Sequence, residues 1–117
     1  MPMSDIRIRD DRAAGRLEAV DADGELVGHI AYFTLDAPEP ALVPVHTIVE
    51  PAHEGQGIAG SLAREIYDIA AREARKVAPL CPYVASWATR HPDDAPPATP
   101  ELLRAAKLWL KNHPESR

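Results

Sequence analysis

Residues 45–60 read VHTIVEPAHEGQGIAG, and this stretch decides the fold. Its first part is a β-branched run that ends at Val49 and predicts a buried strand. Apolar residues recur at helical spacing from Ile58 onward. Between the two lies Gly55-Gln56-Gly57-Ile58-Ala59, where several backbone N–H groups can point at one place with no side chains in the way. We therefore expect an anion-binding loop between a strand and the start of a long helix.

The residues after the loop complete a βαβ unit. An apolar stripe at helical spacing predicts a helix over residues 58–76. The apolar run 77–81 then predicts a strand parallel to the one before the helix, which is the right-handed βαβ arrangement. Residues 82–90 predict a short helix, since Pro82 suits its first position.

The N-terminal part predicts antiparallel strands. Residues 15–36 indicate a hairpin with the pair Asp23-Gly24 at its tight turn. Residues 42–49 indicate a third long strand, in which Pro44 weakens the prediction for the first half. Together with the βαβ unit, these strands predict one mixed sheet.

The C-terminal part predicts a stiff linker and one more helix. Prolines cluster between His91 and Glu101, where little regular structure is expected. Thr99-Pro100 is typical of a helix cap and first turn, and Leu102, Ala106 and Trp109 then share one face. We expect this helix to pack on the sheet, whereas an exposed stripe would indicate a dimer contact.

Length and charge limit the possible functions. A chain of 117 residues has room for one domain. A net charge of −5 argues against nucleic-acid binding, which needs clustered Lys and Arg. No run approaches the roughly 20 apolar residues that span a bilayer, so we expect no membrane association and a cytoplasmic location. The acidic surface favours amine-bearing partners, and we expect a monomer or a weak homodimer.

Cysteine and histidine usage points to no metal. Cys81 is the single cysteine, so it forms no internal disulfide and has no zinc-finger spacing around it. It is either a small core residue or a reactive thiol. His29, His91 and His113 form no readable ligand set with His46, and we predict that no metal is bound.

The glycine segment can be compared with two known nucleotide-binding motifs. Residues 55–60 match the dinucleotide pattern G-x-G-x-x-G, which is a weak signal by itself. A dinucleotide fold expects the first glycine almost directly after its strand and an acidic residue at the end of the next strand. Here residues 50–54 intervene and the next predicted strand ends at Cys81 without Asp or Glu. A phosphate loop of the G-x-x-x-x-G-K-[ST] kind is absent from the sequence.

The sequence resembles the compact, single-domain members of the GNAT superfamily of N-acetyltransferases. The motifs that carry the likeness are His46-Thr47-Ile48-Val49, the GQGIA segment 55–59 and PLCPYV at 79–84, and the likeness spans about residues 15–92. It implies an α/β fold with a mixed sheet, a truncated form of the GNAT acyl-CoA N-acyltransferase fold with an extra C-terminal helix. Residues 1–92 would form the acetyltransferase domain, and residues 93–117 a proline-rich linker and helix packed on it.

The resemblance also implies a coenzyme site. In that family the equivalent loop holds the pyrophosphate of acetyl-CoA, and the strands beside the helix splay apart to admit the pantetheine arm. Carried over to this chain, the coenzyme contacts are Val49, Gly55, Gln56, Gly57, Ile58, Ala59 and Gly60. The chain departs from the family at two positions, with Glu54 where Arg or Gln is usual and Ile48 where compact relatives often carry Glu.

Two residues are candidates for catalysis of acetyl transfer from acetyl-CoA to a primary amine. His46 has a suitable side chain for a general base, or it is a hydrogen-bonded histidine at a sheet face. Cys81 would cap the helix that Pro82 opens, where the helix dipole favours a thiolate, and it matches the cysteine usually proposed as catalytic in the compact subfamily. The acceptor would be a protein lysine, a terminal amine or a polyamine. The alternative is a module that binds coenzyme A or acyl-CoA without turnover.

Overall fold

A five-stranded mixed sheet forms the centre of the structure, a computed structural model that describes residues 6–116. The sheet follows chain order, with β1 (Arg7–Asp11), β2 (Arg16–Val20), β3 (Leu26–Leu35), β4 (Ala41–Val49) and β5 (Lys76–Val77). The pairs from β1 to β4 are antiparallel, and β4 and β5 are parallel. The predicted hairpin and βαβ unit are therefore both present. The predicted domain 1–92 and the predicted linker and helix 93–117 include residues 1–5 and 117, which lie outside the described residues.

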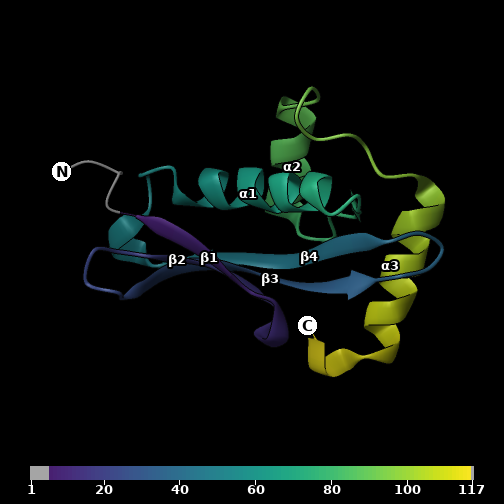
Figure 1. The fold of residues 1–117 in the computed structure, drawn as a ribbon, viewed down its shortest axis with the longest axis horizontal. Helices are drawn as coiled ribbons and strands as arrows, with labels where there is room; N and C mark the ends of the chain where they lie inside the picture. Colours follow the sequence, from purple (N-terminus) through teal and green to yellow (C-terminus); the bar gives the residue numbers. More distant parts are fainter. Residues whose placement is uncertain (1–5, 117) are drawn as a thin grey trace.

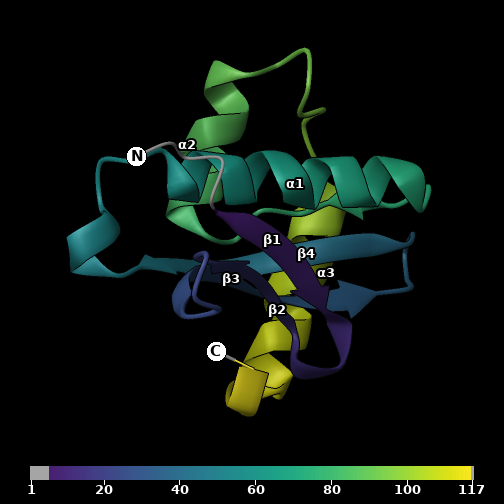
Figure 2. The same cartoon turned by 60° about the vertical axis from the view of Figure 1, so that its left-hand side comes forward.

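Helices cover both faces of this sheet. The long helix α1 (Ile58–Arg72) lies along one face, and α2 (Pro82–Arg90) lies beside it. Helix α3 (Pro100–Asn112) crosses one end of the sheet and carries the C-terminus to the opposite face, as Figures 1 and 2 show from two directions. Single 3-10 turns occupy Arg12–Ala14, Pro51–His53 and Pro114–Ser116. The faces are called the α1 face and the α3 face below.

Each face has its own apolar core. On the α1 face, Leu17, Ile30 and Leu42 of the sheet are buried with Leu62 and Ile66 of the helix. On the α3 face, Ala41 and Val43 are buried with Leu102 and Ala106, and Phe33 stacks on Trp109 with ring centroids 4.1 Å apart. The predicted apolar stripe of α3 therefore packs on the sheet.

The strand β1 was not predicted from the sequence. Its residues are RIRDD, mostly charged and half or fully exposed, as is typical of a short strand at the edge of a sheet. Such a strand carries no apolar alternation for a pattern to detect. It pairs with β2 along its whole length, so the antiparallel part has four strands where the sequence indicated three.

The helix α1 ends earlier than predicted, at Arg72 instead of Lys76. Ala74 adopts a left-handed backbone conformation with φ of 57°, and the Arg75 N–H donates to the Ala70 carbonyl at 2.8 Å. This six-to-one hydrogen bond is the Schellman way of ending a helix. Glycine usually occupies the left-handed position, so the sequence carried no stop signal at Ala74.

The strand β5 is shorter than the predicted run 77–81. Only Lys76 and Val77 form regular ladder pairs with β4. The connection nevertheless continues beyond the ladder. The Ala78 N–H donates to the Leu42 carbonyl at 2.9 Å, and the N–H groups of Leu80 and Cys81 both donate to the Pro44 carbonyl at 3.0 Å.

A β-bulge at Val45 changes which side chains of β4 face α1. Tyr32 pairs with Pro44 and Ala31 pairs with His46, so Val45 is an extra residue between two consecutive partners. The extra residue shifts the alternation by one position. As a result Thr47 lies on the α1 face and His46 on the α3 face, the reverse of what an unbroken alternation from Pro44 gives.

Two predicted local signals are present. Gly24 turns the hairpin with φ of 82°, and the Asp21 side chain accepts hydrogen bonds from the backbone of Asp23 and Glu25 at 2.9 Å each. Thr99 caps α3, since its hydroxyl accepts from the Leu102 N–H at 3.1 Å. Within residues 6–116, no helix is long and apolar enough to cross a membrane.

Candidate functional site

The start of α1 leaves backbone donors open. Gly57 is the residue before the helix and has no side chain with which to cap it, and the first helical hydrogen bond runs from the Ser61 N–H to the Gly57 carbonyl at 3.0 Å. Helix geometry therefore leaves the N–H groups of Ile58, Ala59 and Gly60 without intrahelical partners. The contrast with α3, whose first turn Thr99 caps, indicates that the start of α1 is suited to a bound anion.

Glycine is required in this loop by the backbone itself. Gly55 and Gly57 have φ values of 83° and 80°, a region that other residues enter only with strain. A Cβ built at either position meets no atom within 4 Å. The space beside both glycines is therefore open, as an approaching ligand requires.

A cavity of about 370 Å³ opens at this helix start. Its lining is mostly small or apolar, and comprises Thr47, Val49, His53, Glu54, Gly55, Gly57, Ile58, Ala59, Gly60 and Tyr83. All predicted coenzyme contacts except Gln56 are in this lining, and Gln56 is exposed. The sequence-predicted loop and the cavity therefore coincide.

The charged groups of this lining are unusual for an anion site. The lining contains Glu54 and no Lys or Arg. His53 also contributes, and its Nδ1 atom is buried with no hydrogen-bond partner among the described residues. An unpaired buried nitrogen is costly, so a ligand that bonds to it would be stabilised.

The strands β4 and β5 separate next to this cavity. The last backbone hydrogen bonds between the two chain segments are those to the Pro44 carbonyl, yet β4 continues to Val49. The other segment turns at Cys81 into α2, whose Tyr83 reaches the cavity. Here the cavity is lined by Thr47 and Val49 of β4 on one side and by Tyr83 of α2 on the other, and this part of the cavity is called the gap below.

Cys81 and Thr47 meet at the inner side of this gap. Thr47 Oγ1 and Cys81 Sγ lie 3.3 Å apart, at hydrogen-bond distance. Cys81 is only 2% exposed and is the residue before α2, as the sequence predicted, with no hydrogen bond from its side chain to that helix. Thr47 lines the cavity and Cys81 lies directly behind it. Sequence reasoning missed Thr47, because only the bulge turns it to this face.

His46 lies away from this pair. Its side chain is on the α3 face, where its ring centroid is 6.1 Å from that of His29 in an edge-on arrangement. Burial, followed by the charges of His46 and Arg16, lowers the pKa of His29, and Glu18 opposes that effect. The two sequence-predicted catalytic residues are thus on opposite sides of β4, with His46 on the α3 face and Cys81 beside Thr47 on the α1 face.

The two aromatic residues of α2, Tyr83 and Trp87, have different surroundings. Trp87 is buried, stacks on Tyr67 with centroids 5.9 Å apart, and lies under the Arg64 guanidinium. Tyr83 is half-buried, packs against the apolar core of the α1 face and also lines the cavity. Within residues 6–116, no three His, Cys, Asp or Glu side chains gather closely enough to hold a metal ion.

Solved structures of acetyltransferases share this fold. A ribosomal-protein-alanine N-acetyltransferase from Brucella melitensis biovar Abortus 2308 is 28% identical, with a TM-score of 0.56 over 72% of this chain and 62% of that one. A putative acetyl transfer enzyme from Pyrococcus furiosus is 21% identical, with a TM-score of 0.52 over 64% of this chain and 56% of that one. The chain therefore spans less than two thirds of these structures. No curated protein sequence matches it.

A family model covers most of the chain. The model, described as GCN5-related N-acetyl-transferase, matches residues 16–96. The match contains the loop at the start of α1, the β4–β5 gap and both Thr47 and Cys81, and it ends before α3. The five-stranded mixed sheet with its helices agrees with the fold of the acetyltransferase neighbours. The chain belongs to the GCN5-related N-acetyl-transferase family.

Proposed function

We propose that the protein transfers an acetyl group from acetyl-CoA to a primary amine. The observation that carries this proposal is the continuous path from the uncapped start of α1, through the cavity of about 370 Å³, to the gap beside Thr47 and Cys81. The pyrophosphate of acetyl-CoA occupies the helix start, where backbone N–H groups and the helix dipole favour negative charge. The pantetheine arm follows the free edge of β4 into the gap.

The residues present fit the coenzyme. Small and apolar side chains suit close approach of a long, narrow ligand, and the unpartnered His53 Nδ1 is available to a phosphate oxygen or amide of the coenzyme. Glu54 is exposed, so its carboxylate can turn to solvent when a phosphate binds. Backbone donors take the role that an arginine or lysine has in many phosphate sites.

The proposed chemistry is direct transfer. The lone pair of the neutral amine attacks the thioester carbon, a C–N bond forms, and the C–S bond breaks. The amine loses one proton and the departing thiolate takes one up, so the products are an amide and free coenzyme A. We assign Cys81 to the thioester end of the gap, where its thiol and the Thr47 hydroxyl orient the acetyl group and supply that proton.

One observation favours a second candidate, a module that binds acyl-CoA without turnover. Cys81 is almost fully buried and Thr47 stands between it and the cavity. If that arrangement persists when acetyl-CoA binds, the thiol does not reach the thioester. Both candidates predict coenzyme binding, and only the first predicts release of free coenzyme A thiol when amines are added.

Matched glycine variants test the coenzyme site. Gly57 and Gly24 have φ values of 80° and 82°, and a Cβ at either meets nothing within 4 Å. Gly57→Ala and Gly24→Ala should therefore both lose about 1 kcal/mol of stability. Only Gly57→Ala should weaken acetyl-CoA binding, by tenfold or more in calorimetry, since only Gly57 is at the helix start. Equal affinities in the two variants would contradict the site.

A turnover assay tests the reaction. Free thiol is followed after acetyl-CoA and a panel of primary amines are mixed with the protein, and Gly57→Ala is the control with an impaired coenzyme site. We expect amine-dependent thiol release that Gly57→Ala reduces in proportion to its lost affinity. Tight coenzyme binding without amine-dependent release would favour the binding module.

A further inference from the structure

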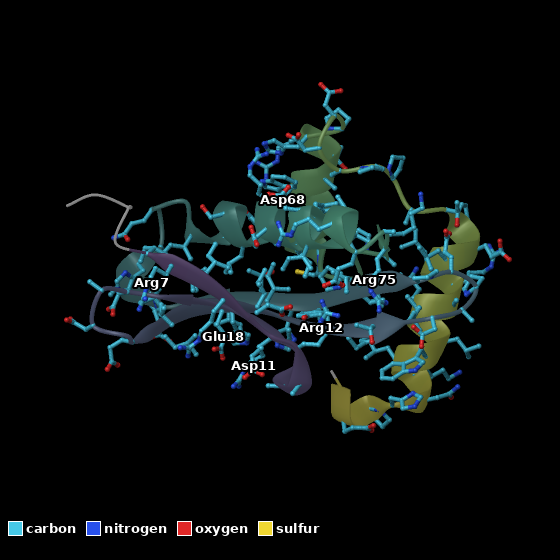
Figure 3. The ribbon with its side chains drawn as sticks, viewed as in Figure 1. Arg7, Asp11, Arg12, Glu18, Asp68 and Arg75 are labelled. Carbon is cyan, nitrogen blue, oxygen red and sulfur yellow. The ribbon has the colours of Figure 1, made fainter. Side chains whose placement is uncertain are left out.

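A second cavity, of about 580 Å³, lies on the α3 face of the sheet. Its polar lining differs from that of the first cavity, because it contains Arg12, Arg16, His29, His46 and Glu115. The volume is in the range of small-molecule sites. Figure 3 shows Glu18, which neighbours this lining, on the side of the sheet away from α1.

The two cavities meet at strand β4. The consecutive residues His46 and Thr47 point to opposite faces, one into each cavity. From Val45 onward no backbone hydrogen bond links β4 to the β5 segment among the described residues, so at His46 and Thr47 the two cavities are separated by strand β4. His46 is the residue of the second cavity that belongs to this strand.

At Arg16 the second cavity adjoins a cluster with more cations than anions, while Glu115 adds a carboxylate elsewhere in its lining. The buried carboxylate of Glu18 bonds with Arg9 Nε at 2.9 Å through one oxygen and with Arg16 Nε at 3.0 Å through the other. Two guanidinium groups thus share one carboxylate, and both ion pairs use Nε atoms. Arg16 itself lines the cavity. The positive charge of Arg12 is instead neutralised by ion pairs with Asp10 and Glu73.

We propose that this second cavity binds the acetyl acceptor, and that the acceptor is a primary amine carrying a carboxylate or similar anionic group. This rests on the proposed function. The Arg16 guanidinium pairs with the anionic group, and the amine extends past His46 to the thioester in the gap. When the amine attacks, the C–N bond forms as the C–S bond breaks, His46 takes the amine proton, and the coenzyme thiolate is protonated on the other face.

The electrostatics of the cavity support an anionic amine over a polyamine. The pKa of His29 is lowered chiefly by burial and then by the charges of His46 and Arg16, so a further cation beside Arg16 is disfavoured. Such surroundings also favour the neutral, nucleophilic form of a bound amine. A polyamine matches the net charge of −5 of the whole chain, but it would place further positive charge beside Arg16.

The C-terminal segment gives this cavity a wall outside the family match. Trp109 of α3 stacks on Phe33, a lining residue, and the following turn brings Glu115 to the cavity. The family model ends at residue 96, before α3. Acceptor choice would therefore be set partly by residues outside the matched region, whereas the coenzyme site lies within it.

Lysine and cadaverine provide the test, because they differ only by a carboxylate. We expect kcat/KM for lysine to exceed that for cadaverine by at least tenfold. Arg16→Gln should raise KM for lysine and reduce this preference to below about threefold, while His46→Gln should lower kcat with little change in KM. Arg9→Gln is the matched control, since it removes the other partner of Glu18 but Arg9 does not line the cavity.

A binding readout separates failure of this inference from failure of the proposed function. Backbone amide shifts of Gly15, Ala31 and His46 are followed by NMR during titration with lysine and with cadaverine, in the presence of coenzyme A. Shifts with lysine alone support the inference even without turnover, which would count against the transferase. Equal responses to the two amines, no response to lysine, or equal loss in Arg9→Gln and Arg16→Gln would overturn it.

Discussion

The two faces of the sheet hold cavities that are lined by different chemical groups. On the α1 face the lining is a glycine loop, a helix start and small side chains, and on the α3 face it is arginine, histidine and glutamate side chains. Main-chain donors depend on the backbone alone, and they suit the pyrophosphate of the proposed coenzyme. Charged side chains suit the proposed acceptor, which carries an anionic group. The comparison therefore assigns the two proposed ligands to two kinds of lining.

The largest expected effect is on kcat and comes from Cys81, on the α1 face of the sheet. Cys81→Ala should lower kcat by about 10²-fold or more, since general acid catalysis contributes on that scale. The affinity for acetyl-CoA should stay within about twofold, because Cys81 lies behind Thr47 and outside the cavity lining. Steady-state kinetics and calorimetry on the same preparation measure both quantities.

Thr47→Val serves as the companion variant. It keeps the side-chain volume and removes the hydroxyl that lies 3.3 Å from Cys81 Sγ. We expect an intermediate loss of kcat, about tenfold. The free energy of unfolding should stay within about 1 kcal/mol of that of the unchanged protein. A Cys81→Ala protein with unchanged kcat would exclude this thiol from the reaction.

The next effect concerns the α3 face. Trp109→Ala removes the stack on Phe33 and the stack on His113, whose centroid is 3.7 Å from that of Trp109. Because Trp109 is only half-buried, we expect a loss of about 2 kcal/mol in the free energy of unfolding, less than for a fully buried aromatic residue. Urea denaturation measures this loss. Acetyl-CoA affinity should be unchanged, and a parallel loss of affinity would show that the two faces are not independent.

The sequence predicted the parts of the fold that repeat a simple pattern. The hairpin turn at Asp23-Gly24, the stripe of α1 and the cap at Thr99 each depend on residue types at fixed spacing, and all three are present. The glycine loop belongs to this group, because positive φ at Gly55 and Gly57 is the property that glycine alone supplies cheaply. Local chemistry was sufficient in each case.

The parts that the sequence did not predict depend on partners distant in the chain. The charged strand β1 is held by its pairing with β2, and α1 stops at Ala74 without glycine. The bulge at Val45 has the largest consequence, because it decides that Thr47 and not His46 shares a face with Cys81. A bulge is a feature of two paired strands, so counting along one strand cannot find it.

A smaller effect tests the packing of α1 against α2. Burial raises the pKa of Tyr67 to about 12, whereas an unfolded tyrosine titrates near pH 10. The stabilisation from its neutral form is complete below about pH 10 and is lost as the pH rises towards about 12. Thermal unfolding between these values should show a falling midpoint. Tyr67→Phe should flatten that fall, and an identical slope in the variant would place the alkaline sensitivity elsewhere.

The smallest effect tests the charge of the second cavity. The pKa of His29 is lowered, chiefly by burial and then by His46 and Arg16, so the folded state resists protonation that the unfolded chain accepts near pH 6.5. The resulting stability is present above about pH 6.5 and is lost as the pH falls through the folded value. His29→Gln should therefore reduce the loss of stability between pH 7 and pH 5.

Arg16→Gln should reduce this loss of stability less, since the effect of Arg16 on the pKa of His29 is smaller than those of burial and of His46. If Arg9→Gln had the same effect as Arg16→Gln, the positive charge would belong to the Glu18 cluster as a whole and not to the side that faces the acceptor.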